Sequence, residues 1–356
     1  MFASGLPFLG CASAEETRGA LAAQETPGLD SGGDARADVM EREVEPNPGM
    51  DAGPIEADTF EAGMMEAGTL DEGTRETGPL EAGTLDAGPG RDAGAADASG
   101  MRCNGYEALC DRRFDEVVFP TTHNAMSNAD DGWAVPNQTH PMLRQLQDGI
   151  RAMLIDTYSN LGTGYLCHSS CLIGSKKLVD ALSEMADFLG THPNEVLTLV
   201  IEDHLSAADT ETAFVASGLV DFVYIHPSGA AWPTLRTMIT SGHRVVVGAE
   251  MGQPPPAWYH HFYDLAWDTP YTFKSVSEFS CAENRGMRTN ALFLLNHWIE
   301  NPFPSEQLSQ TANAHDTLLG RARQCQTESG KLPNFVAVNH YSVGDLFQVV
   351  RELNGL

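Results

Sequence analysis

Two histidines in the middle of the chain, His123 and His168, each follow a short apolar run. An imidazole titrates near neutral pH, so histidine can take a proton from one group and give a proton to another. Two imidazoles that face one reaction centre can activate an attacking hydroxyl and protonate a departing oxygen. The pair is therefore a candidate acid–base couple for group transfer between oxygens.

Other polar residues follow further apolar runs along the chain. They are Asn124, Asp156, Glu202, Asp203, Glu250, His297 and Asn339. If the apolar runs are strands of a parallel barrel, their carboxyl ends meet at one mouth. A single polar residue at a strand end is more often a loop cap. Unrelated loop caps, however, would not explain why a histidine or a carboxylate follows each of three consecutive apolar runs.

Apolar runs alternate with helix-like segments, as in βα units. Strands are predicted at 117–119, 152–155, 196–201, 222–225, 245–247, 292–295 and 335–338, the first ending at Pro120 and the fourth having the weakest flanks. Helices are predicted at 178–189, where apolar residues have helical spacing, and at 343–353. Together they predict an α/β fold, a (β/α)₈ TIM-type barrel that need not be regular.

The first 100 residues have a different composition. They hold 21 of the 49 acidic residues and 5 of the 21 basic ones, and glycine recurs every fifth residue from Gly63 to Gly88. This period fits neither helix nor strand, and large apolar side chains are sparse. We expect a signal or lipobox-like remnant at 1–11, a disordered acidic Ala/Gly-rich tether at 12–100 and the barrel at 101–356. A cation-binding or wall-binding role for the tether is the alternative.

The cysteines indicate an oxidising compartment. Six of the seven lie in the barrel region, at positions 103, 110, 167, 171, 281 and 325. Two close pairs suggest disulfides 103–110 and 167–171, leaving 281–325 as the third. Zinc is the alternative, but a second pair at finger-like spacing is missing.

The seventh cysteine, Cys11, follows Leu9-Gly10, as in a bacterial lipoprotein cleavage box, although the apolar stretch before it is short. We expect export, as a cell-envelope lipoprotein or a secreted protein. The sequence contains no run of 18 apolar residues, so we expect no membrane span. A net charge of −28 without a basic cluster argues against nucleic acid as a partner. We expect a monomer.

Four segments resemble the X domain of the phosphatidylinositol-specific phospholipase C superfamily. They are 119–127 with His123, 149–156 with Asp156, 166–168 with His168, and 194–202 with Glu202. The resemblance implies that His123 is the general base on an inositol hydroxyl. It implies that His168 protonates the departing glyceride oxygen, which leaves a cyclic phosphate. The substrate would be a phospholipid or another phosphodiester at a membrane surface.

The family neutralises the phosphoryl charge in two ways. One uses an arginine two residues after the second-strand aspartate, a position held here by Tyr158. The other uses calcium, for which Asn124, Asp156 and Glu202 match three places, whereas Leu154 replaces a further glutamate. The resemblance therefore implies a Ca²⁺ site of reduced affinity. Without a metal, Asp156 would orient a histidine.

The remaining site residues are assigned from the late strand ends and the second strand. Asn339 stands where some family members have an aspartate that pairs with the first histidine. His297, Trp298 and Tyr158 are candidates for contacts with the substrate, with an aromatic wall as the alternative for His297 and Trp298. An aromatic run could meet a lipid surface, although core packing is favoured: Trp258, Tyr259, Phe262, Tyr263 and Trp267.

These features predict an exported phosphodiesterase for phosphatidylinositol-like or glycosyl-phosphatidylinositol-like lipids. Two alternatives remain. The barrel could act on another head group, such as a glycerophosphodiester or a sphingolipid. It could also bind lipid or head group without turnover.

Overall fold

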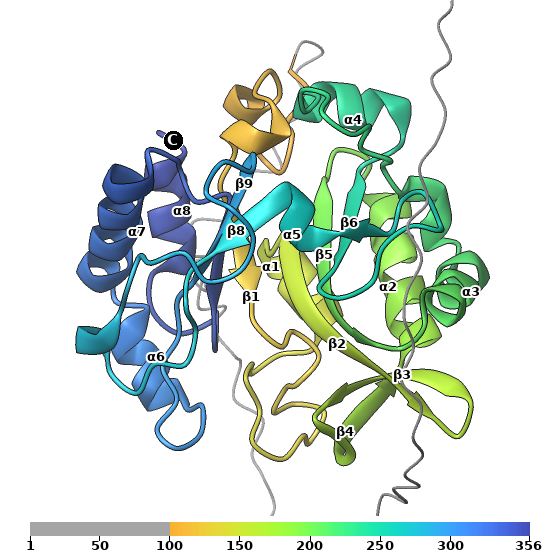
Figure 1. Ribbon diagram of the computed structural model, residues 1–356, viewed down its shortest axis with the longest axis horizontal. Coiled ribbons are helices and arrows are strands. Elements are labelled where there is room, and N and C mark those ends of the chain that lie inside the picture. The colour runs from red at the N-terminus through yellow and green to blue at the C-terminus, as the bar shows by residue number, and fades with distance from the viewer. Residues whose placement is uncertain (1–99) are drawn as a thin grey trace, which may run out of the picture. The chain divides into compact units, whose positions relative to one another are not determined.

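The computed structural model describes residues 100–356, which form an α/β barrel (Figure 1). The strands are β1 Phe119–Thr122, β2 Ala152–Asn160, β3 Thr163–His168, β4 Ser170–Lys177, β5 Leu197–His204, β6 Val245–Ala249, β7 His260–His261, β8 Ala266–Asp268, β9 Leu292–Asn296 and β10 Phe335–Val338. The α-helices are α1 Met142–Asp148, α2 Leu178–Thr191, α3 Ala207–Ser217, α4 Leu235–Ser241, α5 Phe262–Leu265, α6 Glu306–Ala312, α7 His315–Ser329 and α8 Leu346–Leu353. The expected signal or lipobox-like remnant at 1–11 and the expected tether at 12–100 lie outside the described residues, apart from residue 100.

Eight of the strands form one curled parallel sheet in the order β7-β6-β5-β2-β1-β10-β9-β8. Each neighbouring pair along this path is parallel. The two end strands, β7 and β8, are not paired with each other, so the barrel has a seam between them. The predicted TIM-type barrel is confirmed, in an irregular form with one open side.

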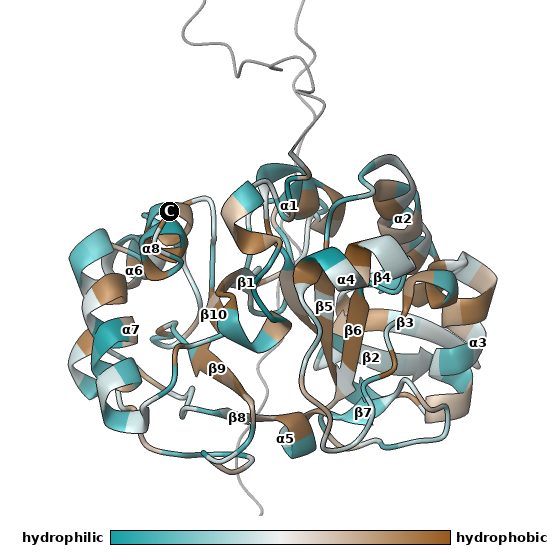
Figure 2. Ribbon diagram, turned by 90° about the horizontal axis from the view of Figure 1, so that it is seen from above, coloured by the Kyte–Doolittle hydropathy of each residue, from teal (hydrophilic) through white to brown (hydrophobic). Residues whose placement is uncertain are grey.

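The strands are buried on both faces, which explains why they are continuous apolar runs in the sequence. Along β2, Met153 and Ile155 belong to the apolar layer beneath the helices, whereas Ala152 and Leu154 belong to the opposite layer. Figure 2 shows the resulting apolar colour along β6 and β9. Because side chains alternate between two apolar layers, most strand residues before the carboxyl end are apolar, and an exception such as Thr198 in β5 is a buried threonine.

Two strand predictions were wrong. The first strand begins at Phe119 and runs through Pro120 instead of ending there. Proline is tolerated at this place because its missing N–H would point toward β2, whose pairing with β1 begins only at Thr121 and Ala152. The segment at 222–225 contains the end of a 3-10 helix, Leu219–Phe222, and only a single bridge between Val223 and Val245. Its short flanks leave no room for a strand.

A long antiparallel hairpin, β3 and β4, extends from the carboxyl end of β2 (Figure 1). The disulfide Cys167–Cys171 closes its tip, and the other predicted disulfides, Cys103–Cys110 and Cys281–Cys325, are also present. The zinc alternative is therefore wrong. In the part of the chain that the structure describes, no helix is long and apolar enough to cross a membrane.

The aromatic run between β6 and β9 belongs to the core. Its five members are all buried: Trp258, Tyr259, Phe262, Tyr263 and Trp267. Tyr259 and Trp267 are completely inaccessible to solvent. The favoured prediction of core packing is confirmed, so this run offers no surface to a lipid bilayer.

Candidate active site

His123 follows β1 directly and is held on two sides. Its Nδ1 lies 2.8 Å from Oδ1 of Asn339, which follows β10. Its ring stacks on Trp298, with ring centroids 3.8 Å apart and an angle of 8° between the planes. The parallel pairing of β1 with β10 places these two strand ends side by side. The structure thus brings His123, Asn339 and Trp298 together.

His168 reaches the same place from the end of β3. Asn124, the residue after His123, has a positive φ of 46°. Its Nδ2 lies 3.2 Å from Nε2 of His168. Both histidines line one cavity of about 330 Å³, together with Asp156, Glu202 and Trp298. The two imidazoles are therefore at one mouth, as predicted.

Burial controls the protonation of both histidines. It lowers the pKa of His123 to about 3, against the opposing effect of the hydrogen bond to Oδ1 of Asn339, and positive charge on His168 and Arg285 adds to the decrease. Burial also lowers the pKa of His168, and the negative charges of Glu300 and Glu202 oppose this. Both imidazoles are consequently neutral at neutral pH in the unliganded protein.

Three carboxylates gather on the opposite wall of the mouth. Asp156 and Glu202 are directly paired across β2 and β5, and Glu250 follows β6. Burial raises the pKa of Asp156 well above its usual value, and repulsion from Glu202 and Glu250 adds to the increase. Among residues 100–356, no side chain donates a hydrogen bond to the Asp156 carboxylate. A bound cation would relieve this unfavourable charge.

The predicted metal ligands are only partly assembled. Asn124 directs its amide nitrogen to His168 and Asn137, which leaves its oxygen for another partner. Glu202 accepts a hydrogen bond of 2.8 Å from Nε2 of His204. No group of three or more His, Cys, Asp or Glu side chains within residues 100–356 is arranged to hold a metal ion. Two carboxylates and one amide oxygen fit a hard cation that keeps water and substrate as further ligands.

A cation that the sequence did not reveal, Arg285, lies in the same mouth. It forms ion pairs of 2.6 Å with Glu250 and with the fully buried Asp268. Its guanidinium also lies over the rings of Tyr263 and Tyr271. These contacts join β6 to β8 across the seam of the barrel. Arg285 comes from an irregular loop, where no periodic pattern marks its neighbours.

Two predicted substrate contacts are not at the cavity. His297 is completely buried, and its Nε2 donates to the Ala312 carbonyl at 2.8 Å while Arg321 lies on its other side. Tyr158 does not line the mouth itself but stacks, with ring centroids 4.3 Å apart, on His204, which does. Trp298 is the member of this group that the structure brings to the site.

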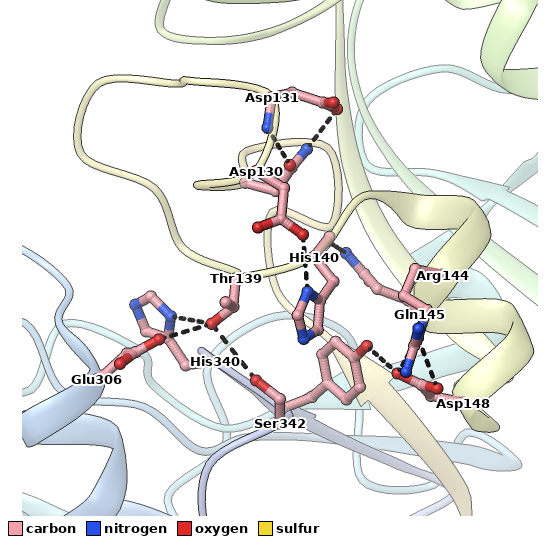
Figure 3. A network of polar contacts seen from close by, with 12 residues as sticks. Asp130, Asp131, Thr139, His140, Arg144, Gln145, Asp148, Glu306, His340 and Ser342 are labelled. Atoms are coloured by element: carbon pink, nitrogen blue, oxygen red, sulfur yellow. Dashed lines mark hydrogen bonds and ion pairs between the residues drawn. The ribbon is translucent and has the colours of Figure 1, made fainter. Parts of the chain in front are cut away.

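A polar network fixes the loops that carry these residues (Figure 3). Thr139, in the loop after β1, donates to Glu306 at 2.9 Å and lies near His340, in the loop after β10. His140 in the same loop is paired with Asp130 at 2.8 Å. The chain segments after β1 and β10 are therefore tied together by side chains as well as by strand pairing.

The sequence profile of the PI-PLC X 1 family matches residues 109–354, which include the whole barrel from its first strand to its last helix. The chain belongs to the PI-PLC X family. The histidines and the carboxylates described above lie inside the matched region. The family and the fold are those of phospholipase C-like phosphodiesterases.

Two relatives of this PI-PLC X chain come from Arthroderma benhamiae. One is an uncharacterized secreted protein, 29% identical over 71% of this chain and 64% of its own length. The other is PI-PLC X domain-containing protein 1, 29% identical over 73% of this chain and 91% of its own length. The chain thus spans less than two thirds of the first relative. A phosphatidylinositol-specific phospholipase C from Staphylococcus aureus, 13% identical, aligns with 69% of this chain and 95% of its own, with a TM-score of 0.48.

Proposed function

We propose that this protein is an exported phosphodiesterase that cleaves a phosphatidylinositol-like or glycosyl-phosphatidylinositol-like lipid between phosphate and glycerol. The observation that carries the proposal is the meeting of His123 and His168 at one cavity. The three disulfides agree with an oxidising compartment. Lipid attachment at Cys11 remains an expectation, since that residue lies before the described region.

His123 is the proposed general base. Asn339 accepts a hydrogen bond from the protonated Nδ1, so Nε2 keeps its lone pair. Nε2 removes the proton from a head-group hydroxyl, whose oxygen attacks the neighbouring phosphorus. The bond from phosphorus to the glyceride oxygen breaks, and a cyclic phosphodiester forms. Burial keeps His123 neutral, so the ring can accept a proton, and an anionic phosphate bound beside it would raise its lowered pKa toward the range in which a base is effective.

His168 is the proposed acid for the departing glyceride oxygen. Burial disfavours its protonated form, whereas the negative charges of Glu300 and Glu202 favour the protonated form. An anionic phosphate that enters the cavity adds a further negative charge close to this ring, which favours the imidazolium. Substrate binding therefore prepares His168 for proton donation. Water can open the cyclic phosphate with the two roles exchanged.

Calcium is part of the proposal. Its ligands would be the Asp156 and Glu202 carboxylates and the free amide oxygen of Asn124. When bound, calcium would neutralise charge that develops on the phosphoryl oxygens. The support is the Asp156 carboxylate, which is buried among like charges without a donor from residues 100–356.

The experiment measures release of phosphorylated head groups from several lipids, in calcium or in chelator. Phosphatidylinositol, a glycosyl-phosphatidylinositol, a glycerophosphodiester and sphingomyelin separate the head-group alternatives. His123→Ala and His168→Ala should each lower kcat about 10²- to 10⁴-fold. Full activity in His123→Ala would overturn the mechanism, and equal activity in chelator would overturn the calcium proposal. If the protein binds these lipids but releases no phosphorylated head group from any of them, the result would favour the alternative of a module that binds lipid without turnover.

A further inference from the structure

The Asn339 side chain lies between His123 and a carboxylate that is remote in the sequence. Its Oδ1 is 2.8 Å from Nδ1 of His123. Its Nδ2 donates to Oε1 of Glu300 at 3.1 Å. Asn339 is fully buried, so water cannot take the place of either partner. The imidazole, the amide and the carboxylate form a continuous chain.

The carboxylate sets which end of the amide meets the imidazole, and Asn137 supports the same orientation, because its Nδ2 donates to Oδ1 of Asn339 at 3.3 Å. A carboxylate accepts hydrogen bonds and donates none, so the amide nitrogen of Asn339 must face Glu300. The amide oxygen must then face His123, and Nδ1 must carry the ring proton. With the amide reversed, its nitrogen would donate to Nδ1 and the proton would move to Nε2. An aspartate at position 339 would need no such partner, because both of its oxygens accept.

A second chain leads from the same carboxylate to the other histidine. Asn137 is fully buried and donates to Oε1 of Glu300 at 3.3 Å. Its Oδ1 accepts from Nδ2 of Asn124 at 3.4 Å. That nitrogen is also 3.2 Å from Nε2 of His168. Glu300 is thus connected through buried amides to both imidazoles.

We propose that Glu300 is a positioning residue for the acid–base pair: it orients the Asn339 amide so that His123 holds its proton on Nδ1, and it supplies the negative charge that the neutral asparagine lacks. This rests on the proposed role of His123 as the base. Glu300 also lines the cavity near His168, so the test must separate a role through Asn339, which lowers kcat, from direct contact with the substrate, which changes KM.

The first test is kinetic and uses the full chain. Glu300→Gln removes the charge and weakens the preference for one orientation of the amide at 339, which Asn137 alone then supports, so kcat should fall about 10- to 100-fold with KM unchanged. Adding Asn339→Asp to this variant places a carboxylate in direct contact with His123. The amide of the glutamine at position 300 can then donate a hydrogen bond to that carboxylate. The double variant should recover most of the lost kcat.

Glu211→Gln is the matched control. It removes the same charge from an exposed position on α3, where the Glu211 side chain makes no hydrogen bond or ion pair within residues 100–356. Its kcat should equal that of the unchanged protein. A rise in KM with constant kcat in Glu300→Gln would show direct substrate contact instead, and would overturn the proposal. The proposal would also be overturned if the double variant, Glu300→Gln with Asn339→Asp, were no more active than Glu300→Gln alone.

The second test needs no substrate. Nitrogen-15 chemical shifts of the imidazole distinguish a proton on Nδ1 from one on Nε2. In the unchanged protein His123 should carry the proton on Nδ1, and in Glu300→Gln this preference should weaken. A proton on Nε2 in the unchanged protein would overturn the inference. If no lipid is cleaved but the tautomer depends on Glu300, the proposed function fails and the orienting role stands.

Discussion

His123 depends on two neighbours that act in different ways. Asn339 fixes the ring through a directional hydrogen bond, whereas Trp298 covers a face of the ring and shields it from water. Trp298 itself is 4% exposed, so it belongs to the core as much as to the site. Replacement of this side chain should therefore affect both stability and catalysis.

Trp298→Ala should lower the free energy of unfolding by about 3–5 kcal/mol, because it leaves a cavity in a buried aromatic position. It should also lower kcat, since the His123 ring loses a packed face. Trp298→Phe keeps an aromatic surface and should retain more of both. Denaturant unfolding and lipid cleavage measure the two effects. An active, fully stable Trp298→Ala would show that the stacking is dispensable.

At the residue scale, the sequence predicted the members of the site that follow strands. His123, Asp156 and Glu202 could be found because each is among the first three polar residues after an apolar run. Arg285 and Glu300 could not be found in this way, because they lie in irregular loops and reach the site through side-chain contacts. His297 satisfied the same pattern but turns to a backbone carbonyl in the core.

The β3–β4 hairpin is the element that delivers His168. It packs on the loop after β1, where Ala134 N–H donates to the Ile173 carbonyl at 2.8 Å. Gly174 lies against the Trp133 ring so closely that a Cβ would overlap it, and its φ of +153° also favours glycine. The hairpin thus has a fixed seat beside the loop that holds Asn124.

Removal of the hairpin disulfide should harm catalysis more than stability. Cys167 and Cys171 are only 4 residues apart, so Cys167→Ser with Cys171→Ser should cost about 2 kcal/mol by the loop-entropy estimate. Removal of Cys281–Cys325, with a separation of 44, should cost about 4 kcal/mol. We expect kcat to fall mainly in the first variant, because His168 lies between its cysteines.

Thermal unfolding and lipid cleavage compare the two double variants. The prediction fails if loss of the Cys167–Cys171 bridge leaves kcat unchanged. It also fails if loss of the Cys281–Cys325 bridge has the larger effect on kcat among molecules that remain folded.

At the element scale, the buried strands could be predicted from the sequence and the exposed ones could not. The strands β5, β6, β9 and β10 are continuous apolar runs and were predicted within a few residues. The hairpin was not predicted, because β4 is largely exposed and its residues show no regular alternation of apolar and polar types. Strands β7 and β8 have two and three residues, too few for a pattern to emerge.

At the scale of the whole molecule, the seam between β7 and β8 distinguishes this barrel from a closed one. No strand pairing crosses it, whereas Arg285 does, with Glu250 on one side and Asp268 on the other. The alternation of elements predicted a barrel, but strand order and closure depend on contacts between distant segments. The seam could therefore not be read from the sequence.

Arg285→Gln should destabilise the barrel by about 3–5 kcal/mol, because it leaves the buried Asp268 and Glu250 carboxylates without their counter-ion. Arg236→Gln removes a surface ion pair with Asp111 and should leave stability unchanged within error. Denaturant unfolding at neutral pH measures both. Equal stability of the two variants would contradict the role assigned to Arg285.

The way in which this seam is closed has a mechanical consequence. Where two strands are paired, widening a barrel mouth requires several backbone hydrogen bonds to break at once. Here the β6 and β8 sides are joined by the Arg285 guanidinium between two carboxylates, by the Tyr263 hydroxyl near the same two carboxylates, and by the short helix α5, so the width of the opening depends largely on side chains. Exchange of single side chains at the seam can therefore change the width of the mouth without refolding the sheet.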